Sequence, residues 1–198
     1  MRFLSGCTVL MALAVGWASG CSSTNAANGT RVTAPFTPEL ARVFDDTVDH
    51  VENVEEIGGR VASDWRHQIE ELARNADFVG VVRVETVTAG TDSSSSQSFR
   101  LTVMVVGNPF RGDLPRDRRM DLRVDEGEVG YHTVRASANR LQTREWIAFV
   151  RWSHDEEGYD RPHWHLTPHN APTLQRVQDI IGYTDPNAPR ETVVRVNN

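Results

Sequence analysis

The apolar pattern of this chain changes its period at Asp77, and that change constrains the fold more than any other feature. Before Asp77, apolar residues recur every three to four positions, as in amphipathic helices. After it, they mostly alternate with polar residues, as in half-buried strands. The sequence therefore predicts an α+β fold, with helices over 38–75 followed by a β-rich part over 77–182. The strands favour a mainly antiparallel barrel or curled sheet.

Two helices are predicted before Asp77. Thr37-Pro38 starts the first, because threonine can cap a helix and proline lacks only an N–H that the first turn does not use. The apolar stripe of this helix runs to Gly58-Gly59, and its acidic residues fall mainly outside the stripe. We interpret these acidic residues as a solvated helix face, and the alternative is that they bind a cation. They are Asp45, Asp46, Asp49, Glu52, Glu55 and Glu56. A second helix over about 63–74 places Trp65, Ile69 and Leu72 on one face.

Strands and a closing helix account for the rest of the predicted domain. The expected strands are 78–84, 99–106, 120–124, 129–136, 145–152 and 162–167. Gly80 is a candidate bulge or close-approach site, and Gly107-Asn108-Pro109 is expected to stop the second strand. The strand at 145–152 is apolar on both faces and should lie at the centre of the sheet. A short helix near 173–181 closes the domain, and 183–198 forms a tail in which 192–196 could add an edge strand.

The first residues are typical of a secretory signal. Within 1–20, Arg2 precedes the apolar stretch 10–15, which is too short to span a bilayer. The end, Ala18-Ser19-Gly20-Cys21, resembles the lipobox of bacterial lipoproteins, whose cysteine is acylated and becomes the mature N-terminus. The resemblance implies palmitate-type acylation of Cys21, membrane attachment and a place in the cell envelope. The residue after the cysteine is Ser22 and not aspartate. In enterobacterial lipoproteins the absence of aspartate at this position favours sorting to the outer membrane, which is therefore the expected location.

Composition limits the partners of the mature chain. Residues 21–37 are rich in small polar residues and predict a flexible tether to a single globular domain over 38–182. Once Cys21 is acylated, no other cysteine is left in the mature chain, so the core must be stable without a disulfide. Removing Arg2 changes the formal net charge from -6 to -7, which argues against nucleic acid. An envelope protein or glycan is the expected partner.

Part of the domain resembles netrin-like domains, the family of small OB-fold barrels that includes the tissue inhibitors of metalloproteinases. The resemblance rests on residues 76–82, 99–103 and 141–149. It implies a barrel that displays loops, and fold alone does not supply a function. The inhibitors bind a target's zinc through a free N-terminal cysteine and carry disulfides, whereas here Cys21 would be acylated. Inhibition by that mechanism is therefore not expected.

Histidines form the one candidate metal cluster. On a strand, His163 and His165 project from the same face, and His169 follows four residues later. Three imidazoles could hold zinc or another divalent ion, with His154 or the acidic turn 155–157 as further ligands. The competing interpretation is that these are polar aromatic surface residues, since the chain has no His-Glu-x-x-His motif.

Motifs for nucleophilic catalysis are missing from the sequence: it has no Gly-x-Ser-x-Gly and no Ser-x-x-Lys. Trp146, Trp152, Tyr159 and Trp164 could form a stacking face for glycans, or they could be core residues. The leading hypothesis is a non-enzymatic, lipid-anchored binding or structural module of the envelope. The alternative is a metal-binding or metal-dependent periplasmic protein that uses the histidine cluster.

Overall fold

The computed structural model describes residues 34–91, 95–154 and 160–184. The predicted signal 1–20, Cys21 and most of the tether lie outside these ranges, as does nearly all of the tail after 183. The predictions made for those segments are therefore not addressed by the structure.

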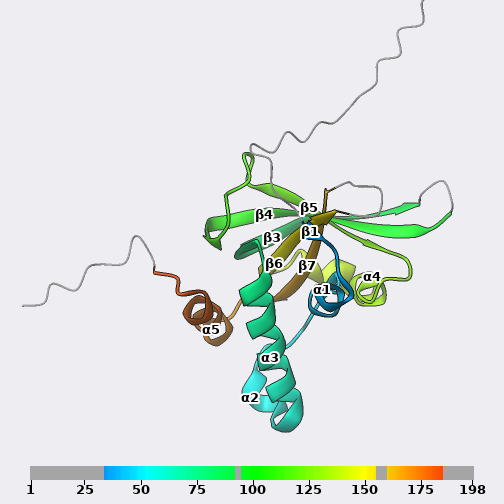
Figure 1. The fold of residues 1–198 in the computed structure, drawn as a ribbon. Helices are drawn as coiled ribbons and strands as arrows, with labels where there is room; N and C mark the ends of the chain where they lie inside the picture. The colour runs from blue at the N-terminus through cyan, green and yellow to red at the C-terminus, as the bar shows by residue number, and fades with distance from the viewer. Residues whose placement is uncertain (1–33, 92–94, 155–159, 185–198) are drawn as a thin grey trace, which may run out of the picture.

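A curled, mixed sheet forms the body of the molecule, as the sequence predicted (Figure 1). Its strand order is β2-β7-β6-β3-β4-β5, with β1 paired to β6. The pairs among β3 to β7 are antiparallel, whereas β2 runs parallel to β7 and β1 parallel to β6. The strands are β1 (Ala34–Pro35), β2 (Thr47–Val48), β3 (Phe78–Thr91), β4 (Gln97–Arg111), β5 (Arg119–Asp125), β6 (Glu145–His154) and β7 (Asp160–Pro168).

The sheet curls because the pairing of β3 with β4 carries two irregularities. The register shifts between Val79 and Val81 and again between Val84 and Thr86, and such shifts bend a strand. The first shift sets four residues of β4, 107–110, opposite Gly80 alone, so the bulge lies in β4. Gly80 is the expected close-approach site, because an added Cβ there would lie 3.0 Å from the Phe78 ring and 3.3 Å from Pro109 Cα. The expected stop at 107–109 is wrong. Gly107 takes a φ of 70°, and the strand continues to pair across the bulge.

The inside of the curl is filled by one apolar cluster. It includes Val82, Leu101, Val103, Trp146 and Trp164, all of them buried. The two ends of the sheet approach each other where the Trp164 indole N–H on β7 donates to the Arg123 carbonyl on β5 over 2.9 Å. The result is a half-barrel, which confirms the curled sheet expected from the sequence.

Helix α4 (Tyr131–Leu141) closes one end of this half-barrel. The sequence predicted a strand over 129–136, and that prediction is wrong. Tyr131, Val134 and Leu141 are buried at helical spacing, whereas Val129, which the strand would have buried, is 74% exposed. The pattern was helical, and the β-branched residues within it concealed the period.

The opposite face of the sheet packs against helices through a second apolar cluster. Helix α3 (Gly59–Asn75) buries Trp65, Ile69 and Leu72 there, which confirms the predicted face. Helix α5 (Ala171–Ile181) packs beside it and confirms the predicted closing helix. Figure 1 shows α3 extending beyond the sheet, with α2 (Val54–Ile57) beside its far end.

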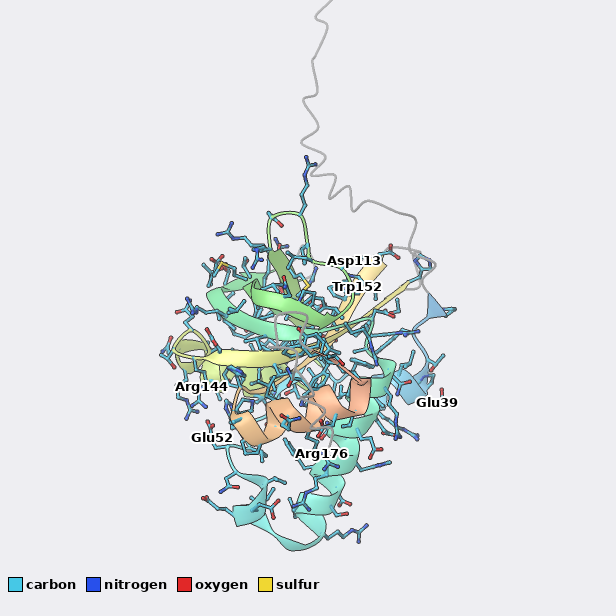
Figure 2. All side chains as sticks on the ribbon, turned by 90° about the vertical axis from the view of Figure 1, so that its left-hand side faces the viewer. Glu39, Glu52, Asp113, Arg144, Trp152 and Arg176 are labelled. Carbon is cyan, nitrogen blue, oxygen red and sulfur yellow. The ribbon has the colours of Figure 1, made fainter. Side chains whose placement is uncertain are left out.

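The predicted long N-terminal helix is wrong. Its start is confirmed, because Thr37 caps α1 (Pro38–Val43), but this helix ends after six residues. The chain then turns at Asp46, whose φ is 51°, and Thr47–Val48 pairs with β7 before α2 begins. An ion pair between Glu52 and Arg144 holds the segment ahead of α2 (Figure 2). None of the helices among the described residues is long and apolar enough to cross a membrane.

Candidate functional site

Strand β7 carries the two central histidines of the predicted cluster on one face. His163 and His165 point away from the barrel interior, where Trp164 and Leu166 are buried. The prediction that the two rings share a face is therefore confirmed. Facing them is the segment around β2, which carries Asp45, Asp46 and Asp49. We call these five residues, Asp45, Asp46, Asp49, His163 and His165, the histidine–aspartate clasp.

His165 is buried between two carboxylates. Its Nδ1 lies 2.9 Å from Asp45 Oδ1, and its Nε2 lies 3.2 Å from Asp49 Oδ2. Asp49 also accepts from the Trp65 indole N–H over 3.1 Å and from the Val51 N–H over 2.9 Å. One imidazole ring thereby links β7 to the β2 segment, and through Asp49 to helix α3.

The carboxylates of Asp45 and Asp49 keep His165 protonated. Burial disfavours the charged ring, but the hydrogen bonds and negative charges of Asp45 and Asp49 outweigh it and raise the pKa of His165 to about 9. Burial also disfavours the Asp49 carboxylate, yet its hydrogen bond and attraction to His165 leave the pKa of Asp49 below its ordinary value. His165 is therefore an imidazolium at neutral pH.

His163 forms the second half of the clasp. Its Nδ1 lies 3.0 Å from Asp46 Oδ2, and its ring stacks on Phe36 with 3.5 Å between ring centroids. Asp46 also accepts from the Trp164 backbone N–H over 2.9 Å. Burial raises the pKa of Asp46, and the neighbouring His163 and Arg161 oppose that rise only in part.

The clasp overturns the interpretation of the acidic run as a solvated face for Asp45, Asp46 and Asp49, whereas Glu52, Glu55 and Glu56 are exposed as predicted. Asp46 is 4% exposed, and Asp45 and Asp49 are half-buried against β7. Their burial is stable because each carboxylate meets a histidine, and buried charges need such partners. The same contacts explain why α1 ends early: a continuous helix could not place all three carboxylates along an extended strand. The sequence signal for these contacts was the position of His163 and His165 in a strand whose other central residues are buried, because a buried histidine needs a polar partner.

The same geometry bears on the predicted metal site. Both ring nitrogens of His165 are engaged by carboxylates, and a nitrogen that donates its proton has no lone pair for a metal. His169 does not join the other two histidines, because its Nδ1 lies 3.3 Å from Glu145 Oε2. Within 34–91, 95–154 and 160–184, no group of three or more His, Cys, Asp or Glu side chains could hold a metal ion.

The suggested aromatic platform for glycans is not formed by its main members. Trp146 and Trp164 are fully buried in the barrel interior, where the Trp146 indole N–H donates to the Leu141 carbonyl over 2.9 Å. Trp152 is half-buried, and Tyr159 lies outside the described residues. The alternative interpretation, that these are core residues, is confirmed for the two buried tryptophans.

A polar hollow on the outer face of the half-barrel was not predicted. It has a volume of about 350 Å³ and lies over β3, β4 and β5. Its lining residues are Thr88, Gly90, Ser98, Arg100, Thr102 and Asp121. The signal in the sequence was the alternation in β4, where polar Ser98, Arg100 and Thr102 alternate with apolar residues that face inward.

Comparison with known proteins found no matching family model, curated protein or solved structure. The lipobox and netrin-like resemblances therefore stay predictions from the sequence.

Proposed function

We propose that this chain is a lipid-anchored lipoprotein of the bacterial cell envelope, with the outer membrane as its expected location. The observation that carries the proposal is the lipobox at 18–21, placed ahead of a polar segment and a folded α+β domain. Two or more acyl chains on Cys21 would anchor the protein stably, because a single chain binds a membrane only marginally.

We further propose that the half-barrel is a non-enzymatic binding or structural module for an envelope protein or glycan. Two features support this role. The histidines, which were the strongest candidates for chemistry, are engaged in the clasp and join the segment leading from the anchor to the sheet. The outer face of the sheet also carries a polar hollow over β3, β4 and β5, lined by residues other than Val79 and Phe110, against which the helices pack.

In-cell crosslinking of the full chain, followed by mass spectrometry of the captured material, tests the proposal. A Cys21→Ala variant, which cannot be acylated, is the control. We expect one dominant envelope component to be captured near stoichiometry by the acylated chain and lost from the variant. Recovery of only abundant lipoproteins, or hydrolytic turnover by the purified full chain, would contradict the binding role.

A further inference from the structure

Arg100 lines the polar hollow and has no hydrogen-bond or ion-pair partner among the described residues. Its neighbours on the same sheet face are paired. Arg119 Nε lies 2.7 Å from Glu85 Oε2, and Arg123 Nε lies 2.7 Å from Asp125 Oδ1. Arg100 faces Thr88 on β3 and Arg123 on β5 in the strand register. Its guanidinium is thus exposed and has all its donors available to a ligand.

Hydroxyl groups line the same hollow. Thr88, Ser98 and Thr102 line the hollow, and the Thr102 hydroxyl donates to Asp121 Oδ1 over 2.8 Å. Gly90 keeps the hollow open at one side, since a Cβ at that position would meet the Ser98 hydroxyl at 3.3 Å. The hollow therefore presents the Arg100 cation, the Thr88 and Ser98 hydroxyls, which can both donate and accept, the Thr102 hydroxyl, which can still accept, and the Asp121 carboxylate.

This set of groups fits a sugar acid. A guanidinium binds a planar carboxylate through two parallel hydrogen bonds, and the threonine and serine hydroxyls can exchange hydrogen bonds with sugar hydroxyls. Asp121 can accept a hydrogen bond from a sugar hydroxyl. The volume of about 350 Å³ lies within the roughly 300–1,000 Å³ of small-molecule sites. A phosphate fits less well, because its second negative charge would lie close to Asp121.

We propose that this hollow binds a carboxylate-bearing sugar unit of a glycan, with Arg100 holding the carboxylate and Thr88, Ser98 and Thr102 contacting the sugar hydroxyls. The inference rests on the proposed role as an envelope binding module and names the class of ligand. It is independent of the clasp, which lies elsewhere on the sheet.

Titration of the full chain in mild detergent tests the assignment, with tri-galacturonate as the acidic probe. Maltotriose serves as the neutral probe and glucose 6-phosphate as the phosphorylated one. We expect tri-galacturonate to bind at least tenfold more tightly than either. The Arg100→Gln variant should lose this preference. The Arg135→Gln variant, which removes the same charge from the exposed surface of α4, should keep it.

Equal binding of acidic and neutral probes, no binding of tri-galacturonate, or an unchanged preference in Arg100→Gln would overturn the inference. Tighter binding of glucose 6-phosphate would overturn the choice of a carboxylate. Thermal unfolding of both variants checks that they are folded. If Arg100→Gln is still acylated and still captures the envelope component, the proposed function stands while the glycan assignment falls.

Discussion

The clasp makes the stability of this domain depend on pH, because His165 is protonated in the folded protein and mostly neutral in the unfolded chain at mildly alkaline pH. The pKa of His165 rises from 6.5 to about 9 on folding. A raised pKa stabilises the fold wherever both states are protonated, that is below about pH 6.5. The stabilisation is lost as the pH rises from that value through about 9.

The size of the effect follows from the shift. At about 1.4 kcal/mol for each pKa unit, protonated His165 contributes about 3 kcal/mol at neutral-to-acid pH. Urea unfolding of the full chain in mild detergent, followed by tryptophan fluorescence, measures this quantity. The free energy of unfolding should fall by about 3 kcal/mol between pH 6.5 and pH 9.5.

Two variants isolate the contribution of His165. His165→Gln cannot carry the charge, so it should be about 3 kcal/mol less stable at pH 6.5 and nearly independent of pH above it. His67→Gln removes a histidine of which 70% of the side chain is exposed, on the surface of α3, and should show the pH dependence of the unaltered chain. Parallel pH profiles for the His165→Gln variant and the unaltered chain would refute the reasoning.

Three further predictions concern the clasp and its surroundings. Asp49→Asn should destabilise the domain more than Asp46→Asn, because the partners of Asp49 favour its charged form whereas burial raises the pKa of Asp46. Equal losses in the free energy of urea unfolding would contradict this. Gly130→Ala should lower the free energy of unfolding by about 1–3 kcal/mol through overpacking, since the added Cβ would clash with the Asp46 carbonyl oxygen. Gly90→Ala should cost less. An unchanged thermal unfolding midpoint in Gly130→Ala would contradict the close contact between Gly130 and the Asp46 backbone. The full chain, dialysed after exposure to zinc, should retain no stoichiometric metal by elemental analysis. If it retained one equivalent of zinc, and the variant with both clasp histidines replaced did not, the metal-binding hypothesis would be restored.

The apolar pattern of the sequence was sufficient to predict those elements whose buried face follows from their own helical or strand period. The apolar face of α3, the two-sided β6 and its hairpin with β7 are examples. Each of them carries an unbroken apolar pattern, and the residues of that pattern are buried in the core. The close approach of the Pro109 backbone to Gly80 could also be predicted, because a glycine within an apolar strand often marks a bulge or a close approach of another backbone.

Contacts between residues distant in sequence determine the structure of the segments that the apolar pattern could not predict. The spacing of Phe44 and Val48 fits a helix, but the chain is drawn into a strand because Asp45, Asp46 and Asp49 reach histidines more than a hundred residues later. Tertiary contacts of this kind override local propensity. The hollow was missed for a related reason, since three strands must be brought side by side before its residues form one surface.

Peptide mass spectrometry of the protein purified from the membranes of expressing cells tests the central claim most directly. The account predicts that the mature chain begins at Cys21 and that this residue carries acyl chains, with none on the Cys21→Ala variant. A mature chain that retains residues 1–20, or one that begins at an unmodified Cys21, would contradict the lipoprotein assignment and with it the proposed place of the half-barrel in the envelope.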